Sequence, residues 1–342
     1  MPESTGRFSP DLARKLAAGI ESGLLANLHA VAVAHRSQTV LEHYAPGEDE
    51  AWGTPLGLVS HGPATLHDLR SVTKSIVGIL YGIALDRGLV PPPEAPLLGA
   101  FPDYPDLDAD PKRAALTVEH ALTMTMGLEW DEFSRPYTDP LNSEIAMELA
   151  PDRYRFCLDR PFVAEPGARW IYSGGAVALI GALIARGTGE TLPDFARDAL
   201  FAPLGIADFG WTAGRDGIPS AASGLRLTAP DLLKIGTMLL DGGTWQGERI
   251  VSAAWLQQSF TPYIPTGDGL HYGRLWFLGE APLQGTTPRW IAGFGNGGQR
   301  LWLAPDLGIA AVSFSGAYNQ PDSWITPFRV WREIVLRNFT GI

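Results

Sequence analysis

The sequence has very little cysteine and no run of basic residues. Its 342 residues include one cysteine, Cys157, so no disulfide can form within the chain. The formal net charge of -11 disfavours nucleic acid or an anionic membrane as a partner. The longest apolar runs, 76–85 and 176–185, are about half the length that spans a bilayer. Segment 1–16 also lacks the basic and apolar regions of a signal peptide. We therefore expect a soluble, cytoplasmic protein.

Several catalytic signatures are missing as well. The chain contains no G-x-S-x-G elbow, which disfavours an α/β-hydrolase, and no P-loop or H-E-x-x-H motif. Gly293, Gly295 and Gly298 match G-x-G-x-x-G, but this run is expected to open a strand, whereas a dinucleotide site opens a helix. The seven histidines lack metal-ligand spacing. The sequence thus predicts scattered histidines, with no metal and no cofactor.

Two other groups of reactive side chains favour structural roles. Cys157 lies in an apolar, helical-looking stretch and is expected to be a buried structural thiol. The carboxylates of Glu129, Asp131 and Glu132 could form an acid–base pair, but a solvated loop is the favoured interpretation.

Hydrophobic periodicity predicts an α+β protein with an antiparallel sheet of five strands. Helical patterns cover 10–27, 68–88, 117–126, 142–159, 175–187, 191–201 and 322–339. Strand patterns cover 29–35, 39–44, 272–278, 299–304 and 309–314, and 46–67 reads as a Gly/Pro loop. We expect residues 1–88 and 220–342 to form the sheet-bearing subdomain and 89–219 a mostly helical insertion, with the active site at their interface.

The helix predicted over 68–88 contains two polar residues at functional spacing. Asp68 is expected to cap this helix, and Ser71 lies in its first turn. Lys74 follows three residues later, on the same face. The positive end of the helix and the nearby ammonium would favour negative charge on Ser71, which makes a serine nucleophilic without a histidine. S-x-x-K alone is a weak signal, because a capping serine and a solvent-directed lysine give the same pattern.

Two further stretches contain residues that could contribute to an active site. Tyr172 lies in a Tyr-Ser-Gly-Gly segment that leads into a helix, where it could hold a proton or simply pack on that helix. The glycine-rich run 290–299 enters a strand, and its glycines would let another backbone or a ligand approach closely.

Together the three stretches resemble the serine β-lactamase/DD-peptidase superfamily of penicillin-binding proteins. The resemblance is to its class C-like branch, with family VIII-type esterases and 6-aminohexanoate-dimer hydrolases, and it spans nearly the whole chain. Segments 120–128, 165–167, 223–228 and 297–300 are also family-like. The resemblance implies a β-lactamase-like fold in which Ser71 is acylated, Lys74 activates it and Tyr172 shuttles the proton. It also implies an oxyanion hole formed by the amides of Ser71 and Asn296.

The chain departs from this family at two positions. Gly174 replaces the asparagine of the Y-x-N element, and Gly293 replaces the cation of the K-T-G element, with Phe294 and Gly295 completing it. Loss of a fixed cation should weaken binding of anionic substrates such as β-lactams, so only weak β-lactamase activity is expected.

The hypothesis from the sequence is a serine hydrolase that acts on a small ester or linear amide. Gly174, Gly293, Phe294 and Gly295 are expected near the substrate, and the candidate cleft walls are Trp130, Tyr137, Trp276 and Trp290, for which core packing is an equal alternative. The alternative function is a penicillin- or peptide-binding sensor or scaffold with little turnover. The sequence is compatible with a homodimer, and the expected partner is the small-molecule substrate.

Overall fold

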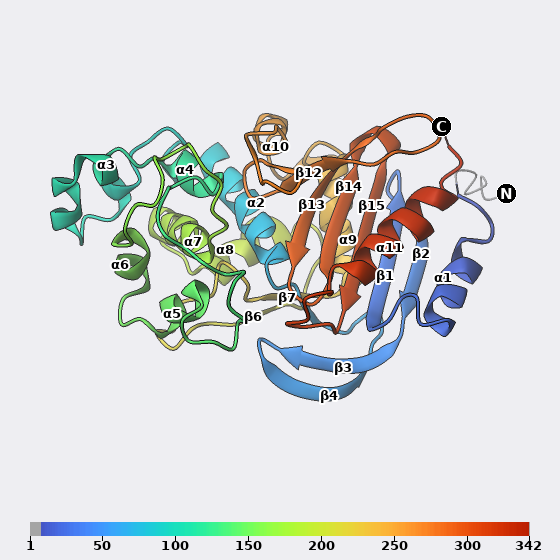
Figure 1. Ribbon diagram of the computed structural model, residues 1–342. Helices are drawn as coiled ribbons and strands as arrows, with labels where there is room; N and C mark the ends of the chain where they lie inside the picture. The colour runs from blue at the N-terminus through green and yellow to red at the C-terminus, as the bar shows by residue number, and fades with distance from the viewer. Residues whose placement is uncertain (1–7, 342) are drawn as a thin grey trace.

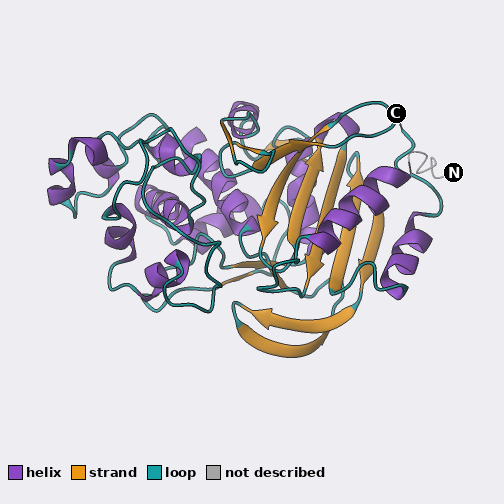
Figure 2. Ribbon diagram, in the orientation of Figure 1, coloured by secondary structure: helices purple, strands orange, loops and turns teal. Residues whose placement is uncertain are grey.

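The computed structural model describes residues 8–341 and confirms an α+β fold with antiparallel strands and flanking helices (Figure 2). Residues 1–7, which belong to the segment without a signal-peptide pattern, lie outside this described part, as does residue 342. In Figure 1 the large sheet lies at one end of the molecule, and helices gather at the other. No helix within 8–341 has the length and apolar character needed to cross a membrane.

The main sheet has eight strands, so the predicted number of five is wrong. Neighbouring strands are antiparallel, in the order β10-β11-β12-β13-β14-β15-β1-β2. Their bounds are β1 Leu28–His35, β2 Gln38–Tyr44, β10 Ile264–Pro265, β11 His271–Tyr272, β12 Phe277–Glu280, β13 Arg289–Gly295, β14 Gln299–Ala304 and β15 Ile309–Ser315. The glycine-rich run 290–299 is therefore mostly strand β13 itself, followed by a turn into β14.

Helices cover both faces of the central strands. β14 and β15 are buried along their whole length, as expected for strands that are covered on both sides. α9 (Ala229–Leu240) packs on β15 and β1 from one side. On the other side lie α1 (Leu12–Glu21) and α11 (Ile325–Arg329), which continues through η5 (Val330–Val335) and η6 (Leu336–Asn338) (Figure 1).

Two long apolar helices join the sheet to the helical part. α2 (Val72–Asp86) packs on β13 and on α7 (Gly174–Thr188), and both helices are buried on nearly every side. Ser173 caps the start of α7, and Gly189 ends it with a positive φ of 73°. The remaining helices are η1 Leu98–Ala100, η2 Pro105–Ala109, α3 Pro111–Ala114, α4 Val118–Leu122, α5 Ser143–Leu149, α6 Arg153–Leu158, α8 Leu192–Ala196, η3 Arg197–Phe201, α10 Ala253–Ser259 and η4 Pro305–Leu307.

The segment predicted as a Gly/Pro loop over 46–67 is largely strand. β3 (Pro46–Ala51) and β4 (Thr54–Ser60) form a hairpin beside the main sheet (Figure 1). The prediction failed because prolines and glycines lie at the ends and at the irregular register of this exposed hairpin, where strands tolerate them. Two small sheets complete the fold, from β5 His67–Asp68, β7 Leu225–Leu227 and β6 Gly210–Trp211, and from β8 Thr244–Trp245 and β9 Glu248–Arg249.

Candidate active site

Ser71 lies at the N-cap position of α2, directly after a strained turn. Arg70 has a positive φ of 48°, which non-glycine residues seldom adopt. A Cβ atom on Gly295 would lie 2.4 Å from the carbonyl oxygen of Leu69, so the absence of a side chain lets β13 pass close to this turn. The predicted cap by Asp68 is wrong, since Asp68 belongs to β5 and its carboxylate binds Arg226 instead.

Lys74 reaches back from α2 to Ser71. Its Nζ lies 2.9 Å from Ser71 Oγ and donates a second hydrogen bond, of 3.1 Å, to the carbonyl oxygen of Ala222. Lys74 is 1% exposed, so its amine is held in a dry environment. The S-x-x-K spacing therefore produces a direct contact between the two side chains.

Tyr172 completes a compact group with these two residues. Its hydroxyl hydrogen-bonds with Ser71, and Lys74 Nζ lies 4.9 Å from the centre of its ring. Burial, followed by the nearby charge of Glu132, raises the pKa of Tyr172 well above its ordinary value. Tyr172 is thus a neutral phenol at pH 7, suited to donating a proton.

Two buried glutamates flank Lys74, and the sequence analysis assigned neither of them to the site. Glu144 Oε2 lies 3.9 Å from Lys74 Nζ, and Ser223 donates a 2.7 Å hydrogen bond to Glu144 Oε1. Glu132 is only 3% exposed, which corrects its interpretation as part of a solvated loop. Its carboxylate accepts hydrogen bonds from the Gly174 amide, Trp130 Nε1 and Tyr137 Oη.

The electrostatics of Glu132 reflect its burial. The pKa of Glu132 is raised to about 7, mainly by desolvation and further by the charge of Glu144. Lys74 and the hydrogen bonds that Glu132 accepts act in the opposite direction. The other two acidic residues of this stretch lie outside the group. Asp131 accepts backbone hydrogen bonds from Phe133 and Ser134, and Glu129 pairs with Arg160.

Gly174 lies where the family has an asparagine side chain, and the two carboxylates fill that space. A Cβ atom at Gly174 would lie 3.0 Å from Glu132 Oε1, 3.1 Å from Glu144 Oε2 and 3.2 Å from Ala222 Cβ. The polar partner beside Lys74 is therefore a carboxylate from the 131–149 segment.

The end of β13 forms one wall of the cleft. Phe294, Gly295 and Asn296 line it together with Ser71. Asn296 is fixed by a pair of hydrogen bonds with Asn319, of 3.0 and 2.8 Å. Gly293 does not line the cleft, because a Cβ atom there would lie 3.0 Å from Ser75 Oγ, on the side that faces α2. The oxyanion role of the Ser71 and Asn296 amides stays a prediction.

A cation does lie beside this wall, although Gly293 cannot provide one. Arg300 pairs with Phe294 in the register of β13 and β14, and its guanidinium lies 4.5 Å from the centre of the Phe294 ring. Burial lowers the pKa of Arg300 to about 10, so it remains charged at pH 7. Arg300 lines the cleft and binds the carbonyl oxygen of Gly295. Its position in the Gly-Gly-Gln-Arg segment was the signal that sequence reasoning did not use.

The cleft itself has a volume of about 910 Å³ and an aromatic lining. Tyr137 lines it as predicted, but Trp276 and Trp290 do not. Trp276 is 1% exposed and packs edge-on against Phe260, and Trp290 packs on Trp302. The aromatic residues that line the cleft are Phe133, Tyr137, Trp170, Tyr172, Phe277, Phe294 and Trp324.

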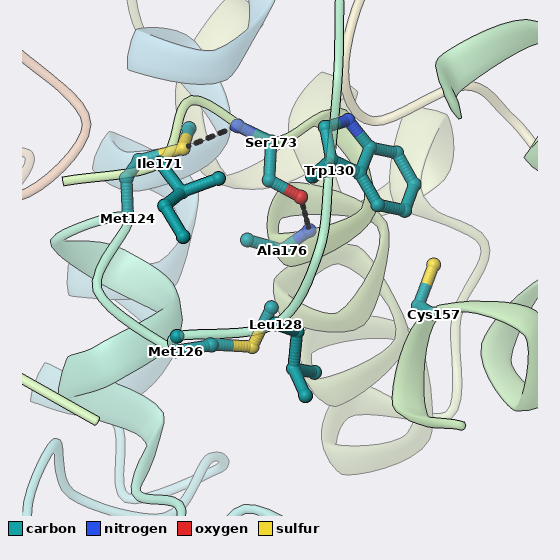
Figure 3. Close-up of a pocket in the computed structure, with 9 residues that line it drawn as sticks. Met124, Met126, Leu128, Trp130, Cys157, Ile171, Ser173 and Ala176 are labelled. Carbon is teal, nitrogen blue, oxygen red and sulfur yellow. Dashed lines mark hydrogen bonds between the residues drawn. The ribbon is translucent and has the colours of Figure 1, made fainter. Parts of the chain in front are cut away.

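Trp130 also lies away from the cleft, in an internal cavity of about 10 Å³ that Figure 3 shows. Cys157 lines the same cavity, where burial raises the pKa of its thiol, as expected for an inert structural cysteine. In Figure 3 Ser173 accepts a hydrogen bond from the Ala176 amide, and its own amide points at the Met124 sulfur. These contacts fix the loop that carries Tyr172.

The prediction of scattered histidines is wrong for three of the seven. His29, His61 and His67 lie together with Asp49. Burial lowers the pKa of His29 to about 4 and that of His67 to about 3, so both rings are neutral at pH 7.

The chain is similar to several known proteins. The chain is 26% identical over 286 residues to 6-aminohexanoate-dimer hydrolase of Paenarthrobacter ureafaciens, covering 76% of this chain and 68% of that protein. It is 32% identical over 192 residues to esterase EstB of Burkholderia gladioli, covering 54% and 47% of the two chains. The solved structure of EstCE1, a hydrolase with promiscuous acyltransferase activity, superimposes with a TM-score of 0.71 at 17% identity, over 94% of this chain and 98% of that one.

A family model described as beta-lactamase matches residues 23–329. With this match over most of the chain, and with the Ser71, Lys74 and Tyr172 group in place, the protein belongs to the beta-lactamase family, within the serine β-lactamase/penicillin-binding protein superfamily.

Proposed function

We propose that this protein is a serine hydrolase that cleaves a small ester or linear amide through an acyl-enzyme on Ser71. The observation that carries the proposal is the 2.9 Å contact between Ser71 Oγ and Lys74 Nζ. The Tyr172 hydroxyl is hydrogen-bonded to the same serine. Such a nucleophile with an adjacent base and a second proton-transfer group is suited to acyl transfer.

In the first half of the reaction, Lys74 in its neutral form takes the proton of Ser71 Oγ as that oxygen attacks the substrate carbonyl carbon. The bond to the leaving group then breaks, and the proton on the Tyr172 phenol passes to the departing oxygen or nitrogen. The proton now on Lys74 returns to Tyr172, so the acyl-enzyme forms with both groups restored. Water then attacks the acyl-enzyme with the same proton transfers, which releases the acid and restores Ser71.

Glu144 stabilises the ammonium form of Lys74 in this scheme. Because its Oε2 lies 3.9 Å from Lys74 Nζ and is only slightly exposed, its charge is poorly screened by solvent. The ammonium that forms when Lys74 takes the serine proton would be stabilised there, as the acidic residue of a catalytic triad stabilises an imidazolium.

The cleft supports a substrate with an apolar portion. Its volume of about 910 Å³ and its seven aromatic side chains suit a drug-sized molecule with few charges. The names of two relatives, an esterase and a 6-aminohexanoate-dimer hydrolase, support an ester or a linear amide as the scissile group. Arg300 is one of two arginines in the cleft lining, with Arg135, and it lies beside the β13 wall, where an anionic group of a substrate could contact it.

The test is a time course of p-nitrophenyl butyrate hydrolysis at a known enzyme concentration. Wild type should release many equivalents of p-nitrophenol, and Ser71→Ala should release none above background while keeping the wild-type circular dichroism spectrum. Ser22→Ala, which changes an exposed serine beyond α1, should retain full activity. Equal turnover by Ser71→Ala and wild type would refute the proposal.

The same experiment distinguishes the alternative of a sensor or scaffold. A binding module that is acylated once would give a burst of one equivalent per chain and then stop. Mass spectrometry of the quenched protein would locate the retained acyl group on the peptide that contains Ser71.

A further inference from the structure

Four potential metal ligands meet where the β3–β4 hairpin joins the main sheet. His29 lies on β1, Asp49 on β3, His61 just after β4, and His67 on β5. One ligand atom from each lies within 4.8 Å of every other. His29, Asp49 and His67 are buried, whereas His61 is half-buried. Residues from four different elements or loops thus meet at one point.

The spacing of these atoms suits a tetrahedral ion. His29 Nδ1 lies 3.0 Å from His67 Nε2, and His67 Nε2 lies 3.6 Å from Asp49 Oδ1. Zinc with bond lengths near 2.0–2.1 Å holds its tetrahedral ligands about 3.3 Å apart, between these two values. The widest pair would have to close by about 1.5 Å at most.

The charges around Asp49 also leave room for a cation. Within residues 8–341, the basic side chain that pairs with the Asp49 carboxylate is His67, at 3.6 Å, and no lysine or arginine pairs with it. A buried carboxylate without a lysine or arginine partner can be compensated by a bound cation. A divalent ion bound by three imidazoles and one carboxylate would provide this compensation.

Hydrogen bonds orient two of the ligands and leave other atoms unused. His67 Nδ1 donates to the carbonyl oxygen of Asp68 at 3.0 Å, which directs the lone pair of Nε2 toward the cluster. Tyr318 Oη donates to Asp49 Oδ1 at 2.8 Å. Asp49 Oδ2 and His61 Nε2 are buried atoms without a hydrogen-bond partner, and each is a natural ligand for a metal.

We propose that His29, Asp49, His61 and His67 form a structural site for a divalent transition-metal ion, with zinc as the expected occupant. Three imidazoles and a carboxylate are a ligand set that zinc accepts in tetrahedral geometry. The ion binds the β3–β4 hairpin to β1 and to the segment that enters α2, because His67 lies four residues before Ser71. Its role is to stabilise this junction, since all four positions of a tetrahedral ion are taken by protein ligands.

The experiment measures metal content in tag-free protein. Full-length wild type is stripped with a chelator, reconstituted with Zn²⁺, passed over a desalting column and analysed by plasma mass spectrometry. The test variant is His61→Gln, chosen because a half-buried position tolerates substitution, and the matched control is His271→Gln, an exposed histidine on β11. Replacement of groups that merely orient ligands costs 10–100-fold in affinity, so loss of a ligand should weaken zinc binding at least that much.

The expected result is about one zinc per chain in wild type and His271→Gln, and little in His61→Gln. Zinc should raise the Tm of wild type and the control but not that of His61→Gln. Reconstitution with Co²⁺ should give wild type the intense visible absorption of a tetrahedral site, which is readable even if a variant folds poorly. A wild-type chain that retains no metal, or a His61→Gln variant that binds zinc as tightly as wild type, would overturn the proposal in favour of a metal-free hydrogen-bonded cluster.

Discussion

Glu144 Oε2 lies 3.9 Å from Lys74 Nζ, and both side chains are almost fully buried. If Glu144 stabilises the ammonium that forms during acylation, Glu144→Gln should lower kcat by about 10–100-fold while leaving KM nearly unchanged. Steady-state kinetics with p-nitrophenyl butyrate measure this. Glu21→Gln, an exposed change on α1, serves as the control. A kcat equal to that of wild type would remove Glu144 from the mechanism.

Tyr172 provides a second kinetic test. Tyr172→Phe keeps the ring that packs against Phe133 but removes the hydroxyl that bonds to Ser71. We expect the rate to fall by about a hundredfold or more, because the leaving group then departs without its proton donor. Tyr263→Phe, at a half-exposed tyrosine, should behave as wild type. The assignment fails if Tyr172→Phe stays within a few-fold of the wild-type rate.

Gly174 can be tested by restoring the asparagine of the family pattern. Its side chain would collide with both glutamates, so Gly174→Asn should lower the free energy of unfolding by about 1–3 kcal/mol. Denaturant titration measures this loss. Combining the change with Glu144→Ala should recover part of it, because space opens beside the new side chain. Gly99→Asn, at an exposed glycine without close neighbours, should cost much less.

Glu132 makes stability depend on pH. Its pKa is raised by burial from 4.5 to about 7, so its contribution is fully present below pH 4.5 and is lost as the pH rises through 7. The free energy of unfolding should fall across this interval by up to about 3 kcal/mol on its account. Glu132→Gln should flatten this part of the profile, measured by denaturation at a series of pH values. Glu129→Gln should keep the wild-type slope, and an unchanged slope in Glu132→Gln would contradict the assignment.

The parts of the site that follow from local sequence were predictable. Ser71 and Lys74 face each other because three residues on a helix bring side chains to one face. Tyr172 could be identified because a short segment and a helix cap fix its place in the chain. Similarly, β1, β14 and β15 consist largely of apolar residues between clear turns.

Other features depend on neighbours that are remote in the sequence. Whether Glu132 is buried or Trp276 reaches the cleft is decided by the packing of other segments, and residue type alone carries no such information. The same holds for His29 and His67, which come together only because β1 and β5 approach each other in the fold. Their spacing in the chain resembles no local metal motif.

β13 passes close to the turn before Ser71. As a result, the neighbouring residues Phe294 and Gly295 differ in how freely protein engineering can change them. Any side chain at 295 would push against the Leu69 carbonyl and displace the nucleophile, so a mutant library should not vary this position. Phe294 points into the cleft instead, and its replacement alters the walls around the substrate while the backbone stays in place. A search for altered substrate range should therefore randomise Phe294 together with Phe133, which also lines the cleft, and leave the glycine fixed.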